Sequence, residues 1–308
     1  MIIKIIPAFF CTILSTYAAA QKNDSALAMG KKTITLSEVV VNNKLNVPVF
    51  IERIKNDSSF YKAFRNLHIL GFSAINDIRI NNSDGDIIAG LHSKTRQVRN
   101  HGCRTMITDE EQTTGDIYDE NHHFNYYTAS LYASLFFTKD SVCGEDNIVN
   151  GRSFSTSGKT GMEKHKEQLK MLFFNPGKKI NGIPFISGKT AIFDDALSGK
   201  YDMHIDMEVH NNINCYVFTQ QVKPEYKNDV VIDAMTTWFN DQTYEVLARN
   251  YSLSYDAGVY DFSVQMEVQL SKFGAWLVPN LIRYTGNWKV VFKKRERGVF
   301  TATLFDFK

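Results

Sequence analysis

Four polar residues in one short segment could together bind a divalent metal. His204, Asp206, Glu208 and His210 alternate with Met, Ile and Val residues. In a β-strand the four would share one face, and imidazole and carboxylate groups are suitable metal ligands. Neighbours two positions apart lie about 6.5–7 Å from each other along a strand, so a complete site needs ligands from another strand. The same alternation is typical of a half-buried strand with a solvated outer face. We favour that interpretation and predict no metal here.

Other motifs of catalysis and nucleotide binding are incomplete. Residues 157–160 (SGKT) resemble the end of a P-loop, but Ser153 stands where its first glycine is required. The adjacent His122 and His123 would point to opposite faces of a strand, and we expect them on a surface loop. The chain contains neither G-x-S-x-G nor H-E-x-x-H. We therefore predict no catalytic residue, and a hydrolase with a dispersed, metal-assisted site is our third hypothesis.

The first residues have the features of an export signal. Lys4 precedes an apolar run from Ile5 to Leu14, and alanines at 18–20 supply a small-residue cleavage site. We expect residues 1–20 to be a signal peptide and residues 21–32 to be a mobile segment. An apolar run of roughly 10–15 residues is too short for a permanent membrane helix. The sequence therefore predicts a periplasmic or secreted protein without a transmembrane segment in its mature chain.

Charge and composition limit the class of partner. The formal net charge is +2, which implies no nucleic-acid partner. The 14 Tyr and 22 Phe residues suit a protein with much strand surface to cover.

Three cysteines follow the signal segment. Cys103, Cys143 and Cys215 permit at most one intramolecular disulfide. We predict the pair Cys103–Cys143, because these residues flank one segment. Buried free thiols are the alternative.

The first half of the chain mixes helical and strand patterns. Val47–Leu67 predicts two short helices with a break at Asp57–Ser59, and Tyr126–Phe137 and Gly161–Phe174 predict two more. The predicted strands of this half are Thr33–Val41, a hairpin of His68–Ile80 with Asp86–Thr95, and Cys103–Ile107.

After Pro184 the pattern is that of β-strands almost throughout. Short links between consecutive strands imply antiparallel pairing. We therefore predict an α+β fold in which a large curled antiparallel sheet, an open half-barrel, packs on a few helices. We expect residues 33–308 to form a single domain, with 150–160 as the candidate boundary if it is divided. The strands are Tyr201–His210, Cys215–Val222, Val230–Phe239, Thr243–Leu253, Val259–Leu270, Leu277–Val291 and Val299–Phe307.

Particular segments of the chain carry resemblances to known families. Together with the strand layout, Leu172–Ile183, Cys215–Phe218, Thr237–Phe239 and the terminal Val291–Phe307 resemble the LolA/LolB-type lipoprotein-carrier superfamily over about residues 160–308. Through Phe60–Leu67, Lys164–Pro176 and Tyr251–Asp261, the whole chain also resembles an exported protein family of Bacteroidota, which implies a location but no activity.

The carrier resemblance implies a non-enzymatic protein that needs no cofactor. It would bind a lipid, a lipidated protein or another apolar ligand between the sheet and its helices, where each buried methylene contributes about 0.8 kcal/mol. The alternative is a structural or interaction module of the cell envelope, whose partner is an envelope protein and whose core the same residues fill. The candidate lining residues are Leu169, Leu172, Phe173, Phe218, Trp238, Phe262, Val264, Met266, Trp276 and Leu277.

Overall fold

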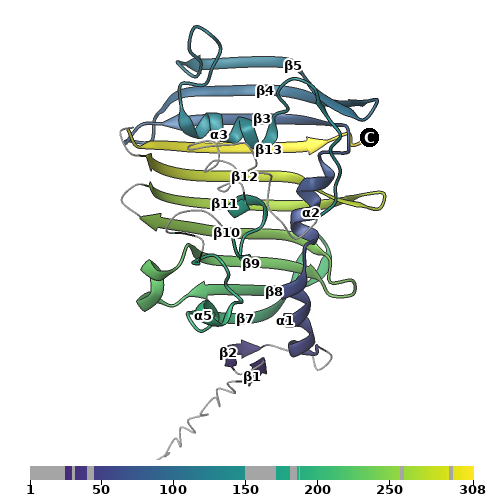
Figure 1. Ribbon diagram of the computed structural model, residues 1–308, viewed down its shortest axis with the longest axis vertical. Coiled ribbons are helices and arrows are strands. Elements are labelled where there is room, and N and C mark those ends of the chain that lie inside the picture. Colours follow the sequence, from purple (N-terminus) through teal and green to yellow (C-terminus); the bar gives the residue numbers. More distant parts are fainter. Residues whose placement is uncertain are drawn as a thin grey trace, which may run out of the picture.

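The computed structural model describes residues 25–29, 32–39, 45–149, 171–180, 186, 188–256, 260–290 and 294–308. Within them, the strands form one sheet in the order β1-β2-β7-β8-β9-β10-β11-β12-β13-β3-β4-β5-β6 (Figure 1). The strands are β1 (Ser25–Met29), β2 (Lys32–Val39), β3 (Phe72–Asn81), β4 (Ile87–Asn100), β5 (Cys103–Gly115), β6 (Val142–Cys143), β7 (Tyr201–His210), β8 (Ile213–Val222), β9 (Ile232–Asn240), β10 (Val246–Asp256), β11 (Tyr260–Phe273), β12 (Trp276–Val290) and β13 (Glu296–Phe305). The helices are α1 (Val47–Asn56), α2 (Ser59–Asn66), α3 (Tyr127–Phe136), α5 (Asp195–Ser198) and the 3-10 helix η1 (Pro224–Asp229).

The sheet is antiparallel from β7 to β6 and does not close into a barrel. Among the strands of the described residues, only β2 joins it in parallel, alongside β7. β1 and β5, which lie at or next to the two ends of the strand order, are far apart in Figure 1, and α1, α2 and α3 cover one face. This confirms the predicted α+β fold with a large open antiparallel sheet packed on a few helices.

One pairing unites the two halves of the sequence. β13 lies antiparallel to β3, in a register that runs from Arg297 opposite Asn81 to Phe305 opposite Ser73. The hairpin of β3 and β4 is thereby added to the end of the C-terminal strand series. Residues 72–115 therefore continue the same sheet.

The broken helix predicted at Val47–Leu67 is confirmed, with local causes for its start and its break. Asn46 Oδ1 accepts a hydrogen bond of 3.3 Å from Val49 N and so caps α1. The Asp57 carboxylate then accepts one of 3.1 Å from Ser59 N, where α2 begins. Both helices bury apolar side chains against the sheet, among them Phe50 and Phe60.

The helix-covered face of the sheet forms the core. On β11 the buried Phe262, Val264 and Met266 alternate with polar residues on the other face. They belong to one continuous cluster that also contains Phe60 of α2 and Trp288 of β12.

The disulfide prediction is also confirmed. Cys103 of β5 and Cys143 of β6 are joined with an S–S distance of 2.01 Å. Cys215 is a buried free thiol.

Some elements differ from the sequence-based expectation. Ser25–Met29 forms β1 within the segment 21–32 that we expected to be mobile, because each of its residues pairs with one of β2. β5 continues to Gly115, well beyond the predicted Ile107, because its polar residues pair with β4. Residues 171–174 are helical, whereas the rest of the predicted helix 161–174 and the signal segment 1–20 lie outside the described residues. None of the described helices is long and apolar enough to cross a membrane.

Candidate functional site

Six of the ten predicted lining residues lie in the packed core. Each of them is 2% exposed or less, and none lines the pocket described below. Large apolar side chains at this degree of burial pack against one another and leave little room for a ligand. The six are Leu172, Phe173, Phe218, Phe262, Val264 and Met266.

The other four predicted residues lie elsewhere. Trp238 of β9 is paired with Val217 of β8, and Val217 is paired with Asp206 of β7. Because paired residues of neighbouring strands share a face, the side chain of Trp238 lies on the outer face of the sheet, away from Phe218. Trp276 and Leu277 are half-buried at the start of β12. Leu169 lies outside the described residues.

The four polar residues of β7 are engaged on this outer face. His204 Nε2 lies 3.3 Å from Asp206 Oδ2. Trp238 Nε1 donates a hydrogen bond of 3.0 Å to Glu208 Oε2, and its ring centroid lies 5.6 Å from that of His210. Within the described ranges, no group of three or more His, Cys, Asp or Glu residues is placed to hold a metal ion.

A different set of residues encloses a cavity of about 190 Å³ between α2 and α3, which we call the α2–α3 pocket. Its apolar wall is largely aromatic, and the rings of Phe64 and Phe174 lie 4.6 Å apart. The principal apolar residues are Tyr61, Phe64, Phe72, Leu135, Phe136 and Phe174. An apolar cavity of roughly 150 Å³ is large enough to hold benzene. The α2–α3 pocket therefore has room for one short apolar group.

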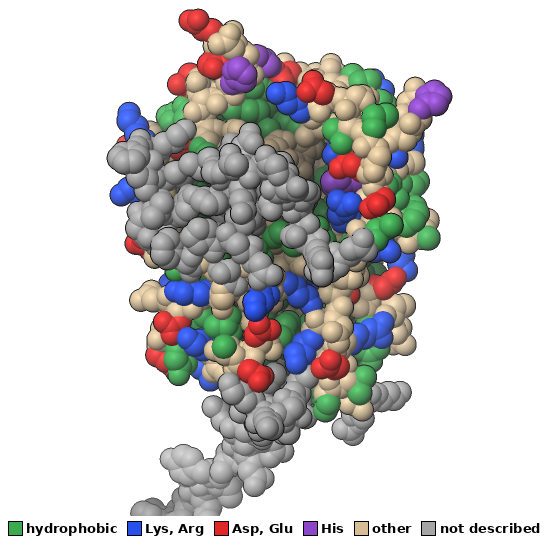
Figure 2. Space-filling view, in the orientation of Figure 1, with side chains coloured by type: hydrophobic (Ala, Val, Ile, Leu, Met, Phe, Trp, Pro, Cys, Tyr) green, Lys and Arg blue, Asp and Glu red, His purple; other side chains and the backbone are tan. Residues whose placement is uncertain are grey.

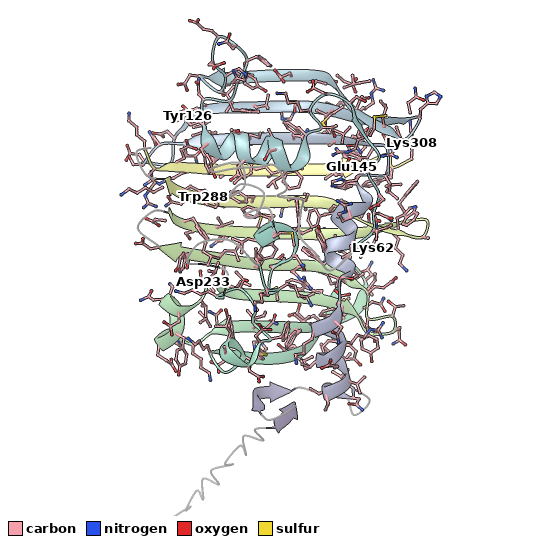
Figure 3. The ribbon with its side chains drawn as sticks, in the orientation of Figure 1. Lys62, Tyr126, Glu145, Asp233, Trp288 and Lys308 are labelled. Carbon is pink, nitrogen blue, oxygen red and sulfur yellow. A yellow bond between two sulfur atoms is a disulfide. The ribbon has the colours of Figure 1, made fainter. Side chains whose placement is uncertain are left out.

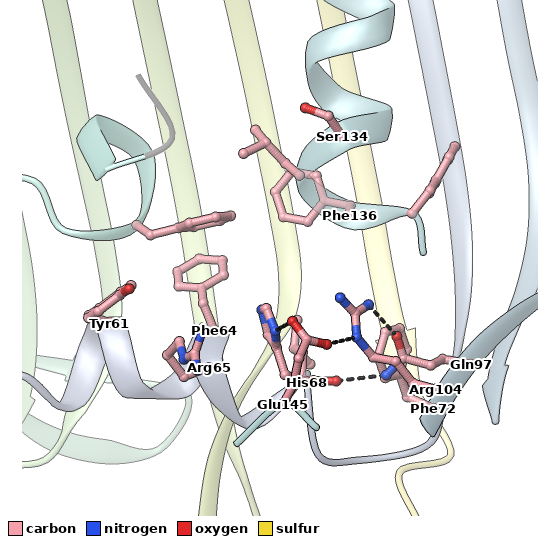
Figure 4. A pocket seen from close by; sticks show the side chains of 14 residues that line it. Tyr61, Phe64, Arg65, His68, Phe72, Gln97, Arg104, Ser134, Phe136 and Glu145 are labelled. Carbon is pink, nitrogen blue, oxygen red and sulfur yellow. Dashed lines mark hydrogen bonds and ion pairs between the residues drawn. The ribbon is translucent and has the colours of Figure 1, made fainter. Parts of the chain in front are cut away.

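One end of this pocket is charged (Figure 4). Glu145 lies between His68 and Arg104, with Oε1 at 2.6 Å from His68 Nδ1 and Oε2 accepting a hydrogen bond from Arg104 Nε. The side chains of His68 and Glu145 are each 23% exposed, and that of Arg104 is 16% exposed. The pocket thus combines an aromatic wall with an ionic group at its edge.

Two neutral side chains hold Arg104 in place. Its Nη1 donates to Gln97 Oε1 at 3.2 Å and to Thr138 Oγ1. Gln97 Nε2 in turn donates to the carbonyl oxygens of Leu67 and Leu70, at 2.7 Å each. The guanidinium is therefore oriented from β4 and from the end of α3 as well as by Glu145.

Glu145 belongs to residues 142–149, which we call the strap. Figure 3 shows Glu145 beside the end of α3 opposite to Tyr126. The disulfide joins the strap to β5 at Cys103, the residue before Arg104. Gly144, with φ of +71°, adopts a left-handed conformation that suits glycine and turns the chain directly before Glu145. The covalent bond and the turn together bring the carboxylate to the guanidinium.

The charges around Glu145 change its acidity. Burial alone would raise the pKa of Glu145, but the hydrogen bonds and charges of His68 and Arg104 outweigh it and lower the pKa to about 2. Glu145 is therefore an anion at any physiological pH.

None of the charged residues of this pocket was predicted from the sequence. Arg104 and Glu145 flank the two paired cysteines, and this adjacency is the one signal that could have indicated them. His68 carries no such signal, because its contact with Glu145 spans 77 positions.

No protein-family model and no curated protein matches this chain. Among solved structures, it is similar to a DUF1329 family protein from Desulfovibrio piger, with 11% identity, a TM-score of 0.26 and coverage of 85% of this chain and 90% of the other. It is also similar to a putative outer membrane lipoprotein-sorting protein domain from Vibrio parahaemolyticus, with 10% identity, a TM-score of 0.27 and coverage of 85% and 91%. At TM-scores this low we base no functional inference on either protein.

Proposed function

We propose that this protein is an exported, non-enzymatic binding protein that takes the apolar part of a lipid or lipidated protein into the α2–α3 pocket. The observation that carries the proposal is the aromatic-walled cavity between two helices on the covered face of an open sheet. Small-molecule sites are typically concave and mostly apolar, with a few placed polar groups. The export signal expected at residues 1–20 supports a periplasmic or secreted location.

The size of the pocket limits what part of the ligand it holds. At about 190 Å³ it is smaller than the roughly 300–1,000 Å³ of typical ligand sites, so it suits one end of an acyl chain. The core residues that we expected to line a larger cavity are packed. A carrier of this kind binds its ligand partly at the surface, between helices.

The first test is lipid extraction and mass spectrometry on the mature protein, purified from a bacterial periplasm without detergent. Stoichiometric co-purified lipid is the expected result. The protein should also take up an apolar fluorescent probe, and Leu135→Trp, which fills the pocket, should reduce this uptake at least about tenfold. Ile107→Trp is the matched control, because Ile107 is 42% exposed on β5 and does not line the pocket.

A second candidate function is an interaction module of the cell envelope. Met207 and Val209, near the end of β7, are 37% and 69% exposed and form an apolar surface. A lipid-free protein that takes up no probe would contradict the carrier proposal and favour this one. A photo-crosslinking residue at position 209 would then capture an envelope protein, whereas the same residue at the exposed Glu110 would not.

A further inference from the structure

At the charged end of the α2–α3 pocket, two arginines and a histidine contact two carboxylates of the strap. Glu145 lies on His68 and Arg104, and Asp146 Oδ1 lies 3.2 Å from Arg65 Nη2. Arg65, His68 and Arg104 all line the same cavity as Phe64 and Phe136. The two arginines and the histidine thus meet the aromatic wall, and the carboxylates come from one short segment.

These nitrogen-bearing side chains are held by other parts of the structure. Arg104 is fixed by Gln97 and Thr138, and the backbone oxygen of His68 accepts a hydrogen bond of 2.6 Å from Arg99 Nη1. Arg65 projects from α2, and its Nε is buried without a hydrogen-bond partner. Removing Glu145 would therefore leave a preorganised group of donors, with one donor already unsatisfied.

The strap itself has few backbone bonds to the sheet. β6 is two residues long and pairs only through Cys103 with Cys143 and Arg104 with Val142. Beyond it, Gly144 N donates one backbone hydrogen bond of 3.4 Å to Gly102 O, and side chains provide the contacts described above, together with a hydrogen bond of 2.9 Å from Asn147 Nδ2 to Asn66 Oδ1. If a bound anion displaced the Glu145 carboxylate from His68 and Arg104, the disulfide and the sheet would remain unchanged.

We propose that the ligand of the α2–α3 pocket is an amphiphile with one anionic group, a carboxylate or a phosphate, which replaces the Glu145 carboxylate between His68 and Arg104 while its apolar part enters the cavity. This rests on the proposed function and names the ligand chemistry of that site. Arginine donates in a fork that fits both kinds of anion, and such charge-assisted hydrogen bonds are the strong ones. Glu145 is the built-in competitor of the ligand and lowers its affinity.

The test measures binding of 4-phenylbutyrate and of its neutral counterpart 4-phenylbutan-1-ol to the full mature chain by calorimetry at pH 7. Glu145→Gln should bind the carboxylate at least about tenfold more tightly than the wild type, because the competing charge is gone. It should bind the alcohol as the wild type does. Glu110→Gln, an exposed carboxylate of β5 paired with Lys94 at 3.8 Å, is the matched control and should change neither affinity.

A second measurement does not depend on the folding of a variant. In the wild type, 4-phenylbutyrate should shift the NMR signals of the His68 ring, whereas acetate and inorganic phosphate at the same concentration should not. If a free anion shifts them equally, the ligand is an anion and the amphiphile proposal is wrong.

Different experimental results would contradict the proposed function and the anionic group of its ligand. If each probe binds to the wild type and to Glu145→Gln with the same affinity, the pocket recognises only apolar groups. The proposal that its ligand carries an anionic group is then disproved. If neither probe binds to any form of the protein, the proposed function fails, and this inference fails with it.

Discussion

The Glu145 carboxylate lies 2.6 Å from the His68 ring nitrogen Nδ1, although the two residues are 77 positions apart. His68 follows α2, and Glu145 follows the disulfide-linked β6. Their contact fastens the strap across one end of the pocket between α2 and α3. Several consequences of this arrangement can be measured.

Glu145 should make the stability of the protein depend on pH in the acid range. Its pKa is lowered from 4.5 to about 2 in the folded chain, so its stabilisation is complete above about pH 5 and is lost as the pH falls toward 2. Because the side chain is 23% exposed, we expect only about 1–2 kcal/mol after screening by water. Urea unfolding of the wild type and Glu145→Gln should show this difference at pH 7 and a smaller one at pH 3. A difference that stays constant with pH would contradict the ionic role of Glu145.

The disulfide should contribute more than any single strap contact. It closes a loop with a sequence separation of 40, for which loop entropy gives about 3–4 kcal/mol. A reductant should therefore lower the thermal midpoint of the wild type and increase hydrogen exchange in residues 142–149. The double variant Cys103→Ser with Cys143→Ser should start at the lower midpoint and show no response to the reductant. An equal response in that variant would assign the effect to something other than this bond.

Glu296 should act as a remote N-cap of α3. Its carboxylate accepts hydrogen bonds from the backbone nitrogens of Tyr127 at 3.0 Å and Thr128 at 2.8 Å, and from Thr128 Oγ1 at 2.8 Å. Glu296→Ala should lower the free energy of unfolding by about 1–2 kcal/mol, the usual cost of losing a helix cap. Glu267→Ala, which removes an exposed carboxylate 3.4 Å from Arg283, should cost far less in the same unfolding experiment. Equal losses in the two variants would show that the cap is not significant.

Gln220 should reduce stability in the wild type. Its side chain is 0% exposed, and neither Oε1 nor Nε2 has a hydrogen-bond partner. Gln220→Met keeps a similar length and removes the unsatisfied groups, so the free energy of unfolding should rise by about 1–3 kcal/mol. The neighbouring exposed Gln221→Met is the control and should have little effect. A loss of stability in Gln220→Met would mean that the amide is satisfied by a bound water or ligand.

Much of the fold was predictable from local patterns. The alternation along Val264 and its neighbours and the short links after Pro184 predicted consecutive antiparallel strands, and the polar break at Asp57 predicted two helices. Such patterns work because burial on one face of a strand or helix imposes a fixed period on the sequence. The face of an individual residue was harder to predict. Trp238 was a candidate lining residue of the apolar ligand site, whereas the register of β9 places its side chain on the outer face beside Glu208.

The sequence by itself therefore determined the kinds of elements and their antiparallel order, whereas the bond between Cys103 and Cys143, predicted from the sequence with free thiols as the alternative, was decided by the tertiary structure. Only the tertiary structure decided that β3 follows β13, that six of the ten expected lining residues are packed in the core, and that His68, Arg104 and Glu145 meet at one pocket. The physical reason is that element type depends on neighbours within a few residues. The site depends instead on contacts between residues tens of positions apart, and its charged side chains show no periodic pattern in the sequence.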